Sequence, residues 1–269
     1  MVRFPGDGGK RMEKPGSSSY RRSGISPAQD PVTPLLSLLV ALVAPPRSGS
    51  ELVQQMHDRY AGKWYTSLTF VQTTTFPDGR TETWYEAMTV PGKLRIDIAP
   101  VGEKNVILFS GDSIYRWQKG EARPGQAFVH PLMVLGFDVY GQPVERTLAQ
   151  LRSIGYDLTK IHADSWQGRP VWVVGADSGD MTTKQFWIDQ ERLVFVRSLE
   201  LVGRDAKVVS EIQFNRYRPL GQGWIAPEVQ MFRDGKLQMK EEYDQVRIDL
   251  RPSAELWDAT KFPLATWMN

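Results

Sequence analysis

The segment VPGKLRIDIAP, residues 90–100, contains the pattern on which the prediction of the fold depends. After the Pro-Gly pair, charged residues alternate with aliphatic ones: Lys93, Arg95 and Asp97 lie between Leu94, Ile96 and Ile98. Side chains of a strand point alternately to its two faces, so this pattern predicts a strand with a wet face and an apolar face. The apolar face must pack either into an ordinary core or against a molecule that the protein holds.

Similar strand patterns recur from SLTFVQTTTF (67–76) to LQMKEEYDQVRID (237–249). Short polar links such as DQER (189–192) and RDGK (233–236) separate them, which is typical of antiparallel hairpins. About ten or eleven strands joined in this way predict a mainly β fold, one large up-and-down sheet that is curved or barrel-like. The sequence shows no βαβ alternation and no glycine-rich phosphate motif, which argues against a nucleotide-binding fold.

Two regions favour helices. Ser48 and Glu51 have capping-box spacing at the start of an amphipathic segment that Gly62 can end. Residues 127–156 lack strand alternation: PLMVLGF (131–137) is a compact apolar stretch, and Pro143 can start a further helix. This insertion is placed to cover the concave side or one end of the sheet, either as a packing helix or as a mobile lid.

The N-terminal region has the pattern of a secretory signal peptide. Residues 1–33 are basic and rich in Gly, Ser and Pro, and the uncharged run 35–44 is too short to span a bilayer as a helix. We therefore expect residues 1–46 to be a leader for export to the periplasm and residues 47–269 to form a single domain. An N-terminal anchor that is never cleaved is the alternative.

Composition excludes several classes of site. The 269 residues include no cysteine, which rules out disulfides, thiolate zinc sites and thiol nucleophiles. His57, His130 and His162 stand far apart in the sequence, so we expect no metal site. Without the leader, the basic and acidic residues nearly balance, so we expect no nucleic-acid partner.

The sequence offers few candidates for catalysis. The GxSxG motif of a serine nucleophile is absent. Asp177, Ser178 and Asp180 favour a hairpin loop over a calcium site, because the further oxygen ligands of a calcium loop are missing. Glu241 and Glu242 could supply paired carboxylates, but neighbours on a strand point to opposite faces. We expect a protein that is not an enzyme and that uses no cofactor.

The series of elements resembles the periplasmic lipoprotein-carrier family, the LolA/LolB-like proteins, and the outer-membrane lipoprotein-sorting-like proteins. The resemblance covers roughly residues 50–262 and is carried by motifs in order: ELVQQMHDRY, SLTFVQTTTF, WYEAMTVPGKLRIDI, NVILFSGDSIYRW, KQFWIDQERLVFVRSLEL and YDQVRIDLRPSAELWDATKF. It implies an unclosed antiparallel barrel wrapped around a few short helices, with an apolar cavity for acyl chains. The family has an arginine before the proline of the strand turn that fastens a lid. Val90 stands in that place here, so the latch does not carry over.

We therefore expect a non-catalytic periplasmic carrier or binding protein for lipids or lipoprotein acyl chains, with transfer partners in the inner or outer membrane as a possibility. The residues expected to line its cavity are apolar and come from the strands and the insertion: Leu68, Phe70, Trp84, Met88, Leu94, Ile96, Ile98, Trp117, Leu132, Met133, Leu135 and Phe137. The alternative is an envelope interaction or sensor module built on a closed β scaffold. A third reading is a hydrolase that uses Glu241 or Glu242.

Overall fold

The computed structural model describes residues 44–261. The predicted leader and signal peptide fall on residues 1–46, and residues 1–43 lie outside the described part. Within residues 44–261, no helix is long and apolar enough to cross a membrane.

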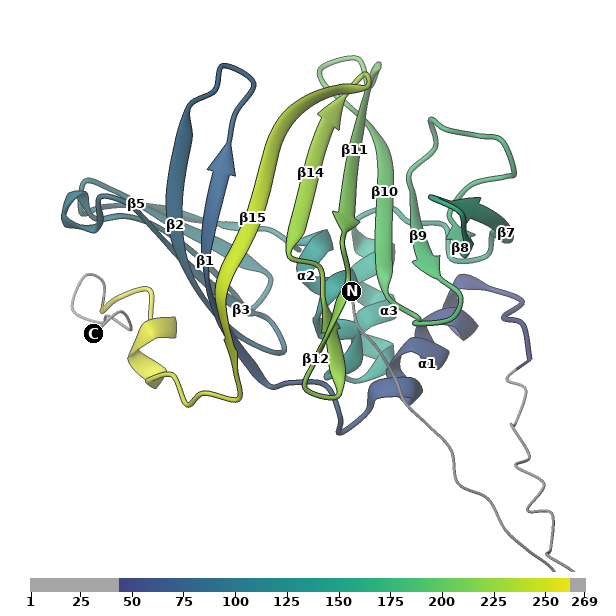
Figure 1. Ribbon diagram of the computed structural model, residues 1–269, viewed down its shortest axis with the longest axis horizontal. Helices are drawn as coiled ribbons and strands as arrows, with labels where there is room; N and C mark the ends of the chain where they lie inside the picture. The colour runs from purple at the N-terminus through teal and green to yellow at the C-terminus, as the bar shows by residue number, and fades with distance from the viewer. Residues whose placement is uncertain (1–43, 262–269) are drawn as a thin grey trace, which may run out of the picture. The chain divides into compact units, whose positions relative to one another are not determined.

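One antiparallel sheet of thirteen strands forms most of the described chain (Figure 1). Its order is β6-β5-β4-β3-β2-β1-β15-β14-β11-β10-β9-β8-β7. The first half contains β1 (Ser67–Thr75), β2 (Thr81–Thr89), β3 (Lys93–Ile98), β4 (Asn105–Ser110), β5 (Ser113–Gln118) and β6 (Glu121–Ala127). The second half contains β7 (Ile161–Trp166), β8 (Arg169–Val174), β9 (Gln185–Asp189), β10 (Phe195–Val202), β11 (Val208–Asn215), β14 (Glu228–Arg233) and β15 (Lys236–Ile248). The predicted mainly β, antiparallel fold is confirmed.

The sheet is open. Its edge strands β6 and β7 each pair with a single neighbour and not with each other. The fold is therefore the unclosed barrel that the resemblance implied, and the closed scaffold of the alternative hypothesis is not formed. The hairpin of β12 (Arg218–Leu220) and β13 (Gly223–Ile225) follows β11 and precedes β14 in the chain, and it forms a separate two-stranded sheet.

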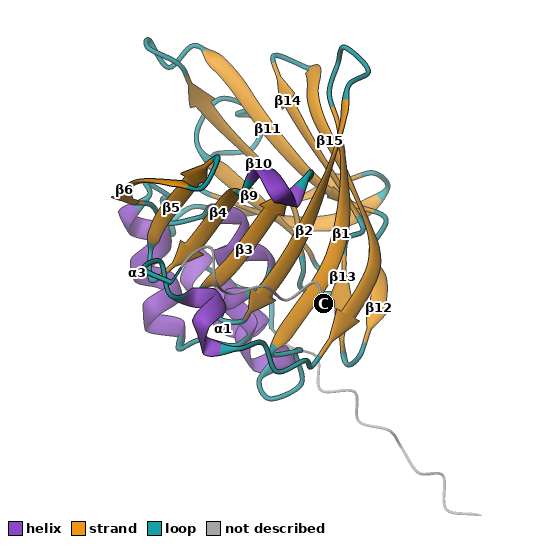
Figure 2. Ribbon diagram, turned by 90° about the vertical axis from the view of Figure 1, so that its left-hand side faces the viewer, coloured by secondary structure: helices purple, strands orange, loops and turns teal. Residues whose placement is uncertain are grey.

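The three α-helices of the described residues lie together on one side of the sheet (Figure 2). They are α1 (Gly49–Tyr60), α2 (Pro131–Gly136) and α3 (Val144–Ser153). Ser48 is the predicted N-cap of α1, where its Oγ accepts a hydrogen bond from the Glu51 N–H at 3.1 Å. Pro143 directly precedes α3, also as predicted. The short 3₁₀ helix η2 (Asp138–Tyr140) joins α2 to α3, and η1 (Val101–Glu103) joins β3 to β4.

Strand β1 joins the two halves of the sheet, because it pairs with β2 on one side and with β15 on the other. Phe70 lies opposite Glu86 of β2, and Thr74 lies opposite Glu241 of β15. Alternate side chains of these strands belong to a core that also includes the buried faces of the helices. The pairing of β1 therefore brings residues of β2 and β15, which are far apart in the sequence, to the same face of the sheet.

The charged face of β3 does not meet water, contrary to the prediction. The side chains of Arg95 and Asp97 are 5% and 8% exposed, and they form an ion pair at 2.9 Å. The 3₁₀ helix η3 (Ala254–Trp257) packs against β3, and Figure 1 shows it in yellow on the side of the sheet away from the α-helices. The alternation of residues within β3 cannot predict that a segment some 160 residues later in the chain covers this face.

Three further elements differ from the sequence prediction. Strand β6 was missed because every one of its residues is exposed, and it therefore has no apolar alternation. The segment DLTKIH (157–162) predicts a strand from Asp157, but strand β7 begins four residues later at Ile161, since Asp157 instead accepts turn hydrogen bonds from Thr159. The β12–β13 hairpin is too short for a periodic pattern.

Candidate functional site: an apolar cavity with buried carboxyl groups

A cavity of about 210 Å³ lies between the sheet and the insertion that carries α2. Its walls come from β1, β2, β3 and β4 in one half of the sheet and from β11, β14 and β15 in the other. Leu132 and Met133 of α2 and Phe137 after it form the cover. An engineered protein cavity of about 150 Å³ is large enough for benzene, so this cavity has room for part of an alkyl chain.

Eight of the twelve residues predicted from the sequence line this cavity: Phe70, Trp84, Met88, Leu94, Ile96, Leu132, Met133 and Phe137. Their common feature is an apolar side chain on the concave face of the first half of the sheet or on the cover. Whether they bind a ligand stays a prediction.

The other four predicted residues do not line the cavity. Leu68 and Leu135 are fully buried in the main core, and Ile98 packs against that core opposite Trp84. The prediction places Trp117 on the cavity face of β5, but its side chain lies on the opposite face. It packs with Val106 in a separate cluster, because an odd offset along β5 separates it from the inward Ile114.

Ten further residues line the cavity that the prediction does not name. Five are apolar and five are polar: Ile107, Phe109, Phe214, Met231, Met239, His130, Gln72, Glu86, Glu241 and Tyr243. All but His130 lie on strands that the sequence pattern indicates. The pairing of β1 with β15, which brings Met239, Glu241 and Tyr243 to the cavity, carries no local sequence signal.

Glu86 and Glu241 are the unexpected feature of this cavity. Both residues are buried, with 4% and 7% of their surface exposed. The Tyr243 hydroxyl donates a hydrogen bond to Glu241 Oε2 at 3.0 Å. Gln72 lies on β1 between the two carboxyl groups and donates from Nε2 to Thr74 Oγ1 at 2.8 Å. A polar strip therefore crosses an otherwise apolar wall.

Burial controls the protonation of both carboxyl groups. Loss of water raises the pKa of Glu241 to about 7, and the hydrogen bonds from Tyr243 and Gln72 moderate the increase. Burial raises the pKa of Glu86 well above its usual value, and the nearby Glu241 carboxylate raises it further. Glu241 and Glu242 point to opposite faces, as predicted, so the adjacent pair cannot act on one bond. The two carboxyl groups that share the cavity and influence each other are Glu86 and Glu241.

His130 also borders the cavity, immediately before α2. Its ring lies edge-on to Phe109 with the ring centroids 4.7 Å apart, and its Nδ1 is buried without a hydrogen-bond partner. Burial lowers the pKa of His130 to about 4, so the ring is neutral near pH 7. Within residues 44–261, the cavity wall therefore presents no cation to balance the two carboxyl groups.

The insertion is fastened to the Pro91-Gly92 turn between β2 and β3. Asp138 of η2 accepts a hydrogen bond from the Gly92 N–H at 2.8 Å, and Gly92 has φ of 80°, which favours glycine. Gln150 of α3 donates to Asp112 at 2.6 Å in the β4–β5 turn, and Arg146 pairs with the same carboxylate. Asp138 therefore anchors the cover at the Pro-Gly turn, where the resemblance had implied an arginine.

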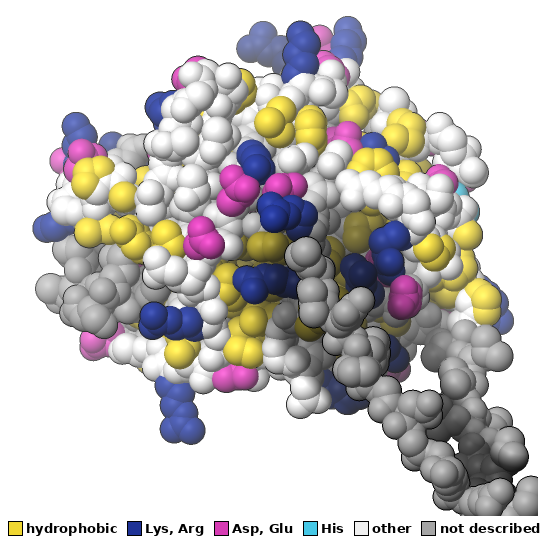
Figure 3. All heavy atoms as spheres, viewed as in Figure 1, with side chains coloured by type: hydrophobic (Ala, Val, Ile, Leu, Met, Phe, Trp, Pro, Cys, Tyr) yellow, Lys and Arg dark blue, Asp and Glu magenta, His cyan; other side chains and the backbone are white. Residues whose placement is uncertain are grey.

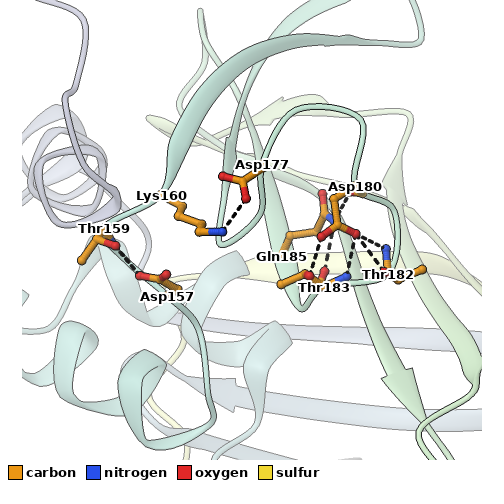
Figure 4. A network of polar contacts seen from close by, with 8 residues as sticks. All are labelled: Asp157, Thr159, Lys160, Asp177, Asp180, Thr182, Thr183 and Gln185. Atoms are coloured by element: carbon orange, nitrogen blue, oxygen red, sulfur yellow. Dashed lines mark hydrogen bonds and ion pairs between the residues drawn. The ribbon is translucent and has the colours of Figure 1, made fainter.

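The loop between β8 and β9 is the hairpin that the sequence predicted. Asp180 accepts hydrogen bonds from the backbone and side chains of Thr182 and Thr183, which hold its pKa well below its usual value (Figure 4). Asp177 pairs with Lys160 at 2.6 Å (Figure 4). Among the described residues, no group of three or more His, Asp or Glu side chains is placed to hold a metal ion.

Charges of both signs are mixed on the surface. Figure 3 shows Lys and Arg beside Asp and Glu side chains, with hydrophobic side chains between them, over the face it presents. That face carries no continuous basic area of the kind that binds nucleic acid.

Comparison with solved structures reveals relatives in fold. An outer membrane lipoprotein-sorting protein domain from Vibrio parahaemolyticus matches 79% of this chain and 97% of its own, at a TM-score of 0.53 and 14% identity. A DUF1329 family protein from Desulfovibrio piger matches 79% and 96%, at a TM-score of 0.51 and 13% identity. A LolA superfamily protein from Nitrosomonas europaea matches 76% and 94%, at a TM-score of 0.47 and 11% identity.

No protein-family model matches the sequence, and no curated protein matches it. At identities this low, the first two structural matches show a common fold and no more. The LolA/LolB-like architecture expected from the sequence is confirmed by them.

Proposed function

We propose that this protein is a non-catalytic carrier or binding protein of the periplasm that holds the apolar part of a lipid or the acyl chain of a lipoprotein. The observation that carries the proposal is the cavity of about 210 Å³, whose apolar lining comes from both halves of an open sheet and from α2. Partners in the inner or outer membrane would supply and receive the cargo. The signal-peptide pattern in residues 1–46 supports the location.

Burial of alkyl surface would supply the affinity. Each buried CH₂ group contributes about 0.8 kcal/mol, which is roughly a fourfold change in the dissociation constant. The lining tolerates chains of varied shape because Met133, Met231 and Met239 have flexible, polarisable side chains. A chain longer than the cavity would have to displace the cover or extend past the open edge of the lining.

A displacement assay with the neutral probe N-phenylnaphthylamine tests the proposal. Straight-chain alcohols of increasing length should displace the probe with an affinity that rises about fourfold per CH₂ and then levels off when the cavity is full. Native mass spectrometry of the protein purified without detergent should show a bound amphiphile. An absence of both effects would refute the proposal.

A matched pair of substitutions locates the binding. Leu132→Trp places a larger side chain at the cavity wall on α2, whereas Leu237→Trp makes the same change at an exposed position on β15. We expect the first variant to bind decanol at least tenfold more weakly and the second to bind like the unmodified protein. Equal binding by both variants would place the ligand elsewhere.

A further inference from the structure

The carboxyl group of Glu86 needs a partner that the described residues do not supply. Glu86 is 4% exposed and lines the cavity, and within residues 44–261 its carboxyl group has no hydrogen bond or ion pair, while its oxygens keep contact with the cavity space. A buried carboxyl group without a partner is costly, so native structures rarely keep one without a role. Its side chain borders the space that the proposed function assigns to a ligand.

The neighbouring groups make this region acidic. Across β1, Glu241 approaches from β15 while Glu86 approaches from β2, and Gln72 lies between them. The remaining polar groups of the cavity wall are the Tyr243 hydroxyl and the neutral His130 ring. Among the residues that the structure describes, no Lys or Arg side chain lines the cavity. The lining therefore holds two carboxyl groups and, among the described residues, no cationic side chain to pair with them.

The polar strip formed by Glu86, Gln72 and Glu241 crosses the apolar wall at one position along β2. Along β2, Glu86 lies between Met88 and Trp84. Met88 is paired with Leu94 of β3, and Trp84 is paired with Ile98. An alkyl chain that contacts Met88 and Leu94 would place its polar end at Glu86 and Glu241. An ammonium group there would favour the carboxylate forms of Glu86 and Glu241 and donate hydrogen bonds to them, whereas a carboxylate would gain no cationic partner.

We propose, on the basis of the proposed function, that the cavity selects amphiphiles whose polar end is a cationic hydrogen-bond donor, a primary ammonium group above all, over carboxylates of equal chain length. Glu86 and Glu241 are the specificity-determining residues. Glu86 receives its missing partner from the ligand, and the hydrogen bond from the Tyr243 hydroxyl holds the Glu241 carboxyl group at the cavity wall.

Competition among three ligands with one chain length tests this inference. Decylamine, decanol and decanoate are each titrated against the protein loaded with N-phenylnaphthylamine at pH 7.5, below their micellar concentrations. Decylamine should displace the probe at a concentration at least tenfold lower than decanol, and decanoate should require at least tenfold more than decanol.

The carboxyl groups are tested by the double variant Glu86→Gln/Glu241→Gln and by Glu86→Gln alone, with circular dichroism to verify folding. In the double variant the amine-to-carboxylate ratio should fall from at least a hundredfold to less than about fivefold. Glu242→Gln, on the same strand but facing the opposite side, is the matched control and should keep the full ratio.

The outcomes separate the two proposals. If decanol binds but the amine and the carboxylate bind equally, the selectivity inference is refuted and the carrier proposal stands. If the preference for the amine survives in the double variant, Glu86 and Glu241 are not its cause and the inference is also refuted. If decanol and the other two ligands all fail to bind, the carrier proposal is refuted and the selectivity inference falls with it.

Discussion

Replacement of Glu241 by glutamine should stabilise the protein, and the gain should grow as pH rises. Burial raises the pKa of Glu241 from its usual 4.5 to about 7. Below pH 4.5 the carboxyl group is protonated in both the folded and the unfolded chain. Between pH 4.5 and 7 the unfolded chain loses the proton first, so the free energy of unfolding falls as pH rises. Above pH 7 the full loss has been reached.

The size of the effect follows from the pKa difference. One pKa unit corresponds to about 1.4 kcal/mol, so the change from 4.5 to about 7 corresponds to roughly 3 kcal/mol. Glutamine keeps the shape of the side chain and an oxygen that accepts the hydrogen bond from Tyr243. The difference in unfolding free energy between Glu241→Gln and the unmodified protein should therefore increase by about 2 to 3 kcal/mol between pH 4.5 and pH 8.

Guanidinium unfolding followed by tryptophan fluorescence at pH 4.5, 6, 7 and 8 measures this difference. Comparison with the unmodified protein at each pH cancels the contributions of His130 and Asp138, which also titrate with shifted pKa values. Glu242→Gln on the outer face is the control and should give a nearly constant difference. A Glu241→Gln difference that changes by less than 0.5 kcal/mol over this range would show that Glu241 is not buried as described, since 0.5 is about a third of one pKa unit.

Three further substitutions test the packing around the cavity. Asp138→Asn keeps the acceptor for the Gly92 N–H but removes a carboxyl group whose pKa is raised by burial to about 7. The variant should therefore have a free energy of unfolding up to about 4 kcal/mol higher than the unmodified protein at pH 8 and a similar one at pH 4. Equal effects at both pH values would contradict this. Asp97→Ala breaks an ion pair buried beneath η3 and should cost about 3 kcal/mol in urea unfolding, against less than 1 if that face were solvated. Gly175→Ala would put a Cβ 2.4 Å from the Lys184 carbonyl oxygen at a φ of 108°, so a loss above about 2 kcal/mol is expected and a neutral result would rule out this close approach.

Local alternation predicted much of the fold and part of the cavity. The pattern of Leu94 and Ile96 identified a strand and its inward face, and the apolar stretch at 131–137 identified the cover. These features depend on neighbours within one element, where the side-chain period is set by the backbone alone.

The remaining features depend on contacts between distant segments. Glu86 and Glu241 reach the same cavity only because β1 pairs with both β2 and β15, and the sequence pattern suggests the adjacent pair Glu241 and Glu242 instead. Arg95 was expected in water, because nothing near it in the sequence predicts that η3 covers that face. Trp117 was assigned by residue type, although its odd offset from Ile114 along β5 places it on the other face.

The central claim is that the interior of this open sheet holds an alkyl chain against α2. A decyl chain with a photoactivatable diazirine at its end tests the claim directly. After irradiation and proteolysis, the account predicts labelled peptides that contain Met133 or Phe137 on the cover and Met231 or Met239 on the facing strands. It predicts that unlabelled decanol suppresses this labelling. Labelling confined to surface strands such as β6, or labelling that excess decanol does not reduce, would contradict it.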